Sequence, residues 1–68
     1  MGNMDATSNM IQRLLMSKCY TAHKAAFLKW PYKKPVKSWY DEDGNICVGY
    51  ESGRWFHYKI TQEGITWW

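Results

Sequence analysis

EDGNICVGYESGRWFHYKITQEG, residues 42–64, contains the three turn signals that decide the fold. Each signal is a pair of polar residues followed by glycine: EDG at 42–44, ESG at 51–53 and QEG at 62–64. This pattern is typical of a three-residue hairpin loop whose glycine adopts the left-handed conformation, in which a residue with a Cβ is strained. The segments between the turns are rich in aromatic and β-branched residues, as strands are. The stretch therefore predicts an antiparallel meander.

The turns also predict how the strands pair. Loops of three residues set three cross-strand pairs: Tyr40 with Ile46, Tyr50 with Arg54, and Thr61 with Ile65. Because side chains alternate between the two faces of a strand, these pairs assign every strand residue to one face. The expected strands are residues 36–41, 45–50, 54–61 and 65–68.

The two faces of the predicted sheet differ in character. The expected core face holds the branched aliphatic residues, and its members are Val36, Ser38, Tyr40, Ile46, Val48, Tyr50, Phe56, Tyr58, Ile60 and Trp68. The opposite face holds three tryptophans, and its members are Lys37, Trp39, Cys47, Gly49, Trp55, His57, Lys59 and Trp67. On this second face Trp55 should lie opposite Gly49, and Trp39, Cys47 and His57 should line up across three strands.

A helix is predicted ahead of the sheet. Asp5, Thr7 and Ser8 can each cap a helix amino terminus, and Pro31 disfavours helical backbone at Trp30. At 100° per residue the apolar residues form one broad face, which consists of Leu15, Met16, Cys19, Tyr20, Ala22, His23, Ala26, Phe27 and Trp30. Ile11, Leu14 and Leu28 lie outside that face, so either the helix is covered more widely than a two-layer arrangement allows or a second contact exists there.

The chain should form one small α+β domain in the order αββββ, with the helix packed on one face of the sheet. We expect a flexible amino terminus at 1–7, the helix at 8–30, a basic connector with proline at 31–35 and the sheet at 36–68. A domain of 68 residues buries only about 60% of the surface that its unfolded chain exposes. This size disfavours a multi-step active site, so we expect no enzymatic activity and no small-molecule substrate.

Composition narrows the class of protein further. With 46% hydrophobic and 22% charged residues, the chain should fold. No apolar run approaches the roughly 18 residues of a membrane span, and the amino terminus lacks the features of a signal peptide. The two cysteines have no CxxC spacing, which favours reduced thiols and a cytoplasmic location.

Charge is unevenly distributed along the chain. Residues 1–37 have seven basic residues against one acidic residue, a net charge of +6, whereas residues 38–68 have two against five, a net charge of −3. The connector alternates lysines with aromatic rings, which is a pattern used to bind single-stranded nucleic acid. A solvated lysine-rich linker explains the same residues, and both interpretations rest on Lys29, Lys33, Lys34 and Lys37.

Cysteine and histidine give two hypotheses about chemistry. Cys19 and His23 share a helix face and Cys47 and His57 should be cross-strand neighbours, so together they form a candidate Cys₂His₂ zinc set. The predicted faces separate the two pairs, and we therefore favour an ordinary buried thiol and a surface histidine, with no metal or cofactor. Cys47 and His57 could also act as nucleophile and base, but the sequence reveals no third orienting group.

The tryptophan-rich face is the strongest functional signal. A single helix leaves this face uncovered, and soluble monomers rarely expose apolar patches above a few hundred Å². We expect it to bind a protein partner or a second copy, as a small inhibitor or adaptor does, and not a membrane. Alternatively the rings lie flat along lysine stems, or they stack on single-stranded nucleic acid. The predicted contact residues are Lys37, Trp39, Trp55, His57, Lys59 and Trp67.

Overall fold

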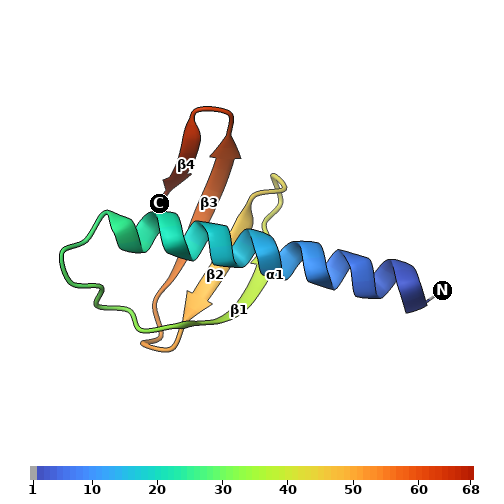
Figure 1. Ribbon diagram of the computed structural model, residues 1–68, viewed down its shortest axis with the longest axis horizontal. Helices are drawn as coiled ribbons and strands as arrows, with labels where there is room; N and C mark the ends of the chain where they lie inside the picture. Colours follow the sequence, from blue (N-terminus) through green and yellow to red (C-terminus); the bar gives the residue numbers. More distant parts are fainter. Residues whose placement is uncertain (1) are drawn as a thin grey trace.

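The computed structural model describes residues 2–68, with side chains from Asn9 onward. Its elements are α1 (Gly2–Ala25), β1 (Pro35–Tyr40), β2 (Ile46–Tyr50), β3 (Trp55–Thr61) and β4 (Gly64–Trp67). The strands form one antiparallel sheet in the order β1-β2-β3-β4, and α1 packs across one face of it (Figure 1). The predicted α+β meander is confirmed.

The first two turns set the register as predicted. Tyr40 lies opposite Ile46. In the second turn the Tyr50 N–H donates to the Arg54 carbonyl at 2.8 Å, and the Gly53 N–H donates to the Tyr50 carbonyl at 2.9 Å. Gly53 has a φ of +98°, the left-handed conformation that the hairpin loop requires. From Lys37 onward β1, and all of β2 and β3, therefore place their side chains on the predicted faces. At the start of β1 the register shifts between Pro35 and Lys37, so that Pro35 and not Val36 lies opposite Tyr50.

The third turn is shorter than predicted. Thr61 pairs with Gly64 and not with Ile65, so the loop contains two residues instead of three. The Thr61 hydroxyl donates to the Gly64 carbonyl at 3.2 Å and accepts the Glu63 N–H at 3.3 Å. These side-chain bonds close the tighter loop, which a threonine can do by imitating a backbone turn. The position of every β4 side chain shifts by one residue as a consequence.

This shift exchanges the two terminal tryptophans between the faces of the sheet. Trp67 lies opposite Tyr58 on the helix side, and its ring stacks on His23 with 4.2 Å between centroids. Trp68 lies on the other side, beside His57, with which it exchanges two backbone hydrogen bonds of 3.1 and 3.2 Å. We predicted the reverse placement for both, and that prediction was wrong because a one-residue slip turns every side chain to the opposite face.

The helix also differs from its predicted limits of 8–30. It begins at Gly2, so residues 2–7 are its first turns, and it ends at Ala25. A tight final turn closes it, in which the Ala26 N–H donates to the His23 carbonyl three residues back. Beyond this point the chain leaves the helix axis and packs aromatic rings around His23, contributed by Phe27, Trp30 and Tyr32.

The core lies between α1 and the sheet. Its fully buried members are Cys19, His23, Ile46, Val48, Tyr50 and Tyr58. α1 crosses the strands at an angle (Figure 1) and does not cover Val36, Tyr40 and Ile60, which keep 54%, 49% and 42% of their surface exposed. These three were predicted core residues, and that prediction was wrong. The register keeps Tyr40 and Ile60 on the predicted face, whereas Val36 lies at the register shift in β1.

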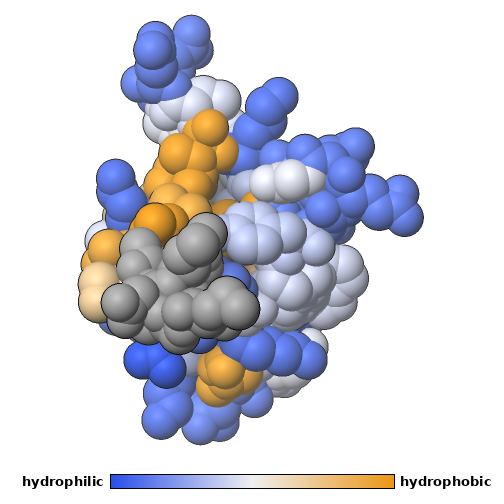
Figure 2. All heavy atoms as spheres, turned by 90° about the vertical axis from the view of Figure 1, so that its right-hand side faces the viewer, coloured by the Kyte–Doolittle hydropathy of each residue, from blue (hydrophilic) through white to orange (hydrophobic). Residues whose placement is uncertain are grey.

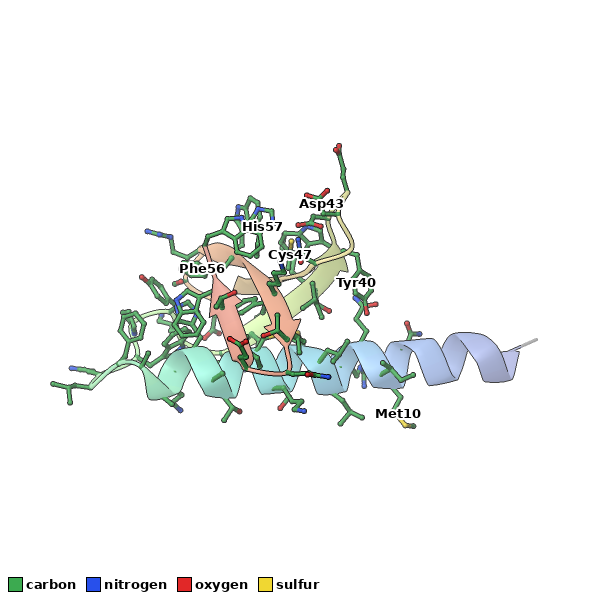
Figure 3. The ribbon with its side chains drawn as sticks, turned by 90° about the horizontal axis from the view of Figure 1, so that it is seen from above. Met10, Tyr40, Asp43, Cys47, Phe56 and His57 are labelled. Carbon is green, nitrogen blue, oxygen red and sulfur yellow. The ribbon has the colours of Figure 1, made fainter. Side chains whose placement is uncertain are left out.

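The amino-terminal half of α1 extends beyond the sheet (Figure 1). With 24 residues at 1.5 Å each, the helix is about 36 Å long. Met10, Ile11 and Leu14 are more than half exposed on this extension, and Met10 points away from the sheet (Figure 3). Seen from this end, apolar side chains gather beside the helix in an otherwise polar surface (Figure 2). The described part of α1 contains no stretch that is both long and apolar enough to cross a membrane.

Candidate functional site: the outer face of the sheet

The face of the sheet turned away from α1, here called the outer face, carries most of the predicted binding residues. Its members are Lys37, Trp39, Cys47, Gly49, Trp55, His57, Lys59 and Trp68. Figure 3 shows Cys47 and His57 on this side, with the helix on the other. Among the described residues, no helix or strand covers the outer face.

Large side chains partly close over the small residues of β2. Cys47 has no exposed surface and Gly49 is buried, although both belong to the outer face. A Cβ on Gly49 would lie 2.9 Å from the Lys37 Cε and 3.4 Å from the Trp39 ring, so the absence of a side chain there makes room for both. The Trp39 and Trp55 rings approach to 5.4 Å between centroids. The rings thus lie partly along a lysine stem and each other.

Two tryptophans on this face remain half exposed. Trp55 keeps 50% of its surface exposed and Trp68 keeps 55%. Both contact His57: the Trp68 ring stacks on the imidazole at 4.9 Å and 5°, and the Trp55 ring lies 5.0 Å away. Together with Trp39 they form a continuous row of rings across the sheet, here called the aromatic row: Trp39, Trp55, His57 and Trp68.

A cluster of three potential metal ligands lies beneath one end of the aromatic row. The Nδ1 atom of His57 is 2.9 Å from Oδ2 of Asp41 and 3.3 Å from Sγ of Cys47. The three ligand atoms all lie within 4.8 Å of one another. They come from three segments, the loop after β1, strand β2 and strand β3, so this cluster exists only in the folded chain.

The sheet register explains why Cys47 and His57 meet. His57 uses its backbone N–H and carbonyl for the bonds to Trp68 in the neighbouring chain segment. Its pairing with Cys47 on the other side is therefore a non-hydrogen-bonded pair. Such pairs bring opposing Cα atoms to about 4.5 Å, closer than hydrogen-bonded pairs do.

Asp41 is held in place by the loop that it begins. Its Oδ1 atom accepts hydrogen bonds from the backbone N–H groups of Asp43 and Asn45, both at 2.9 Å. Its Oδ2 atom faces His57 and also accepts a bond from the Asn45 side-chain amide at 3.3 Å. One oxygen thus fixes the loop and the other is directed at the imidazole.

The electrostatics of the cluster follow from these contacts. Partial loss of water would raise the pKa of Asp41, but hydrogen bonds from Asn45, His57 and Asp43 outweigh it and lower that pKa. Burial, and then the negative charge of Asp41, raises the pKa of the Cys47 thiol. At neutral pH the metal-free cluster therefore contains a carboxylate beside a protonated thiol.

The arrangement of Asp41, Cys47 and His57 differs from a proton relay in which a carboxylate orients a histidine base beside a nucleophile. In such a relay one imidazole nitrogen receives the proton of the nucleophile while the other is oriented by the carboxylate. Here Cys47 and Asp41 approach the same nitrogen of His57, and the thiol has no exposed surface. Asp41 is the third group that sequence reasoning missed. Extending the alternation of Lys37 and Trp39 by one step would have placed it on this face.

The predicted four-residue zinc set is divided between the two faces of the sheet. Cys19 and His23 lie on the helix side, where the Tyr58 hydroxyl is 2.6 Å from His23 Nδ1 and 2.6 Å from the Tyr50 hydroxyl. Burial raises the pKa of Cys19 to about 11 and lowers the pKa of His23. Because the sheet separates these two residues from Cys47 and His57, the four cannot share a metal ion, and that hypothesis was wrong.

The predicted basic patch is also divided. Lys37 lies on the outer face, with its ammonium 5.5 Å from the centroid of the Trp39 ring. The other three lysines, exposed on the segment between α1 and β1, are Lys29, Lys33 and Lys34. The Lys34 carbonyl accepts the Glu51 N–H at 2.9 Å, which ties this segment to the end of β2.

Five of the six residues predicted to bind a partner lie together on the outer face, and the exception is Trp67 in the core contacts. Trp68 takes its place beside His57. Comparisons with known protein families, with curated proteins and with solved structures found no match to this chain.

Proposed function

We propose that this domain is a non-enzymatic interaction module that binds another protein chain through the aromatic row. The observation that carries the proposal is the half exposure of Trp55 and Trp68, which flank His57 on a sheet of four paired strands. Their positions are fixed by backbone pairing and ring stacking before any partner arrives. Binding a partner therefore requires little further ordering of these two side chains.

Tryptophan is well suited to this role. A tryptophan side chain can bury about 150–250 Å², and aromatic residues dominate the energetically important positions of protein interfaces. Cys47 and Gly49 are buried beneath the rings, and the polar group at the centre of the face is His57, which lies between the rings of Trp55 and Trp68 and keeps 28% of its side-chain surface exposed. Charged groups lie at its margins, as in most interfaces, where the rim is polar.

A second copy of the chain has the complementary chemistry. Lys37 lies near one end of β1 and the acidic loop 41–43 follows the other end. If two outer faces meet about a twofold axis with β1 strands antiparallel, the basic end of each copy approaches the acidic end of the other. At standard strand spacings the face measures only roughly 20 by 17 Å, so the dimer should be weak, with a Kd on the order of 10 µM or above.

Sedimentation velocity from about 1 µM to about 1 mM would bracket such a Kd. We expect the wild type to shift from monomer to dimer, and both Trp55→Ser and Trp68→Ser to remain monomeric. The control is Leu28→Ser, because Leu28 is fully exposed beyond the end of α1 and should not affect the dimer. A wild type that stays monomeric up to 1 mM would rule out the second copy as partner, and dimers of undiminished stability in both tryptophan variants would exclude the aromatic row.

Single-stranded nucleic acid is the second candidate, favoured by the contact of Lys37 with the Trp39 ring. The same tryptophans would then stack on bases while lysines contact phosphates. Adding an oligonucleotide at low and high salt separates the candidates. Contacts from Lys37 and Lys59, the two lysines of the outer face, predict a salt slope of about −1.4 for nucleic acid, whereas an apolar protein contact responds little. Absence of oligonucleotide binding at low salt would remove this candidate.

A further inference from the structure

We propose that Asp41, Cys47 and His57 form a binding site for a divalent transition metal ion, and that Zn²⁺ is the ion that fits them. The site lies at the end of the outer face where the loop after β1 meets β2 and β3. It differs from the predicted zinc set because the third ligand is a carboxylate from this loop and not a residue of the helix.

The donor atoms match the preferences of zinc. Thiolate sulfur, imidazole nitrogen and carboxylate oxygen are its three common protein ligands. Tetrahedral zinc with normal bond lengths separates a sulfur and a nitrogen ligand by about 3.6 Å, and a nitrogen and an oxygen ligand by about 3.3 Å. The observed separations are 3.3 Å for Cys47 and His57 and 2.9 Å for Asp41 and His57. Binding would lengthen these two contacts by a few tenths of an ångström. It would also bring the Cys47 sulfur and the Asp41 oxygen, which lie within 4.8 Å of each other, to about 3.6 Å.

In the metal-free cluster two groups approach the same nitrogen of His57. The Nδ1 atom of His57 can carry only one proton, and a proton there is donated to the Asp41 oxygen at 2.9 Å. The Cys47 sulfur lies 3.3 Å from the same nitrogen. A metal ion replaces the protons on Nδ1 and on the thiol with a centre that accepts an electron pair from all three atoms.

Charge and proton balance also favour a divalent ion. On binding, the Cys47 thiol loses its proton to solvent, and the imidazole carries its proton on Nε2 so that Nδ1 can coordinate. One thiolate, one carboxylate and a neutral imidazole then balance the two charges of the ion, so no net charge is left in a partly buried site. Because a proton is released, affinity should rise with pH.

The surroundings already hold the ligands as an outer shell would. The carboxylate of Asp41 is oriented by backbone N–H groups of Asp43 and Asn45, and the imidazole is held by the stacked ring of Trp68. Asp41 and His57 each keep part of their side-chain surface exposed, at 16% and 28%. This leaves a route for the ion and a fourth position for water, which is the arrangement of three-ligand zinc sites.

Cobalt provides the direct test, because a Co²⁺ ion bound to a thiolate has a charge-transfer absorption band in the near ultraviolet. We expect wild-type protein to develop this band when Co²⁺ is added and to lose it when Zn²⁺ displaces the cobalt. Cys47→Ala should abolish the band. Cys19→Ala should retain it, since Cys19 is the thiol on the opposite face of the sheet.

The other two ligands are tested by affinity. His57→Gln and Asp41→Asn should each weaken Co²⁺ binding at least about 10-fold, the lower limit of what losing even an outer-shell partner costs. Glu42→Gln is the matched control for Asp41→Asn, because it removes one negative charge from the same loop at an exposed position. It should change the affinity by less than about 2-fold, and circular dichroism should show that each variant keeps the fold.

Three results would overturn the proposal: a wild type with no thiolate band up to about 1 mM Co²⁺, a band that depends on Cys19 and survives Cys47→Ala, or equal weakening by Glu42→Gln and Asp41→Asn. The last would mean that the acidic loop collects cations without a defined site. The site stands independently of the proposed dimer, since sedimentation of Cys47→Ala reports on the aromatic row alone and cobalt absorption of Trp55→Ser reports on the metal alone.

Discussion

The two faces of the sheet contain the same set of residue types with different outcomes. Each has one cysteine, one histidine and one tryptophan stacked on that histidine. On the helix side these are Cys19, His23 and Trp67, and on the outer face they are Cys47, His57 and Trp68. The third partner distinguishes them, because His23 meets the hydroxyl of Tyr58 whereas His57 meets the carboxylate of Asp41.

This difference decides what each histidine can do. His23 is 1% exposed, and burial lowers its pKa, so it stays neutral within a chain of hydroxyl groups. His57 faces an ionised carboxylate and keeps access to water. On the helix side the third partner is neutral and enclosed, so the cysteine and the histidine have a structural role. On the outer face the third partner is charged and accessible to water, so the cysteine and the histidine can take part in binding a ligand.

The contrast between the two faces is tested most directly at Trp67, in β4, and at Trp68, which follows it. We expect Trp67→Ala to lower the free energy of unfolding by about 2–4 kcal/mol, somewhat below the range for a fully buried aromatic ring, because its ring packs on His23 and Tyr58. Trp68→Ala removes a half-exposed ring and should cost about 1 kcal/mol or less. Urea unfolding of both variants measures the difference.

A larger loss for Trp68→Ala would show that β4 has the register predicted from the sequence, and equal losses would contradict the placement of Trp67 in the core and Trp68 outside it. For a domain of this size each kcal/mol should lower the Tm by about 4–8 °C. Thermal unfolding followed by circular dichroism therefore provides a second measurement of the same contrast.

Most of the sheet could be predicted because its turns are local. In the first two hairpins, glycine in the left-handed conformation fixes a three-residue loop, and pairing follows from alternation alone. The third turn has the same pattern of two polar residues followed by glycine, but the hydroxyl of Thr61 closes it with hydrogen bonds of its own. The pattern of polar residues and glycine does not reveal that a side chain will replace the expected backbone geometry of the turn. The shorter loop placed Trp67 and Trp68 on the faces opposite to those predicted.

The candidate metal site was predictable in part. Cross-strand pairing of Cys47 and His57 followed from the register and is confirmed. Asp41 was placed at the end of the first predicted strand but was assigned to neither face, although its odd number places it on the same face as Lys37 and Trp39. The end of the helix was harder to predict from the sequence, because it depends on how aromatic rings from the connector pack around His23.

The hydroxyl chain on the helix side gives the next contrast. Tyr58→Phe would leave the His23 ring and the Tyr50 hydroxyl without a shared buried partner, which should cost about 1–3 kcal/mol of unfolding free energy. Tyr40→Phe is the matched control, because Tyr40 is 49% exposed and should change stability by less than about 0.5 kcal/mol. If both variants unfold at the same urea concentration, the buried hydroxyl of Tyr58 is not a structural link.

The smallest effect expected is a pH dependence that belongs to His23. Burial lowers its pKa from 6.5, so below pH 6.5 the unfolded chain binds a proton that the folded chain does not. Stability should therefore be fully present above pH 6.5 and fall as the pH decreases, by at most about 1.4 kcal/mol per pH unit for one proton. Asp41, whose pKa is lowered from 3.8, acts in the same direction only in a more acidic window.

Urea unfolding at intervals between pH 7 and pH 5 measures this slope, and substitution of His23 provides the test. His23→Gln should flatten the slope even though it lowers stability at every pH, because the amide does not titrate. A slope that survives unchanged in His23→Gln would show that the burial of this histidine is not what links folding to protons.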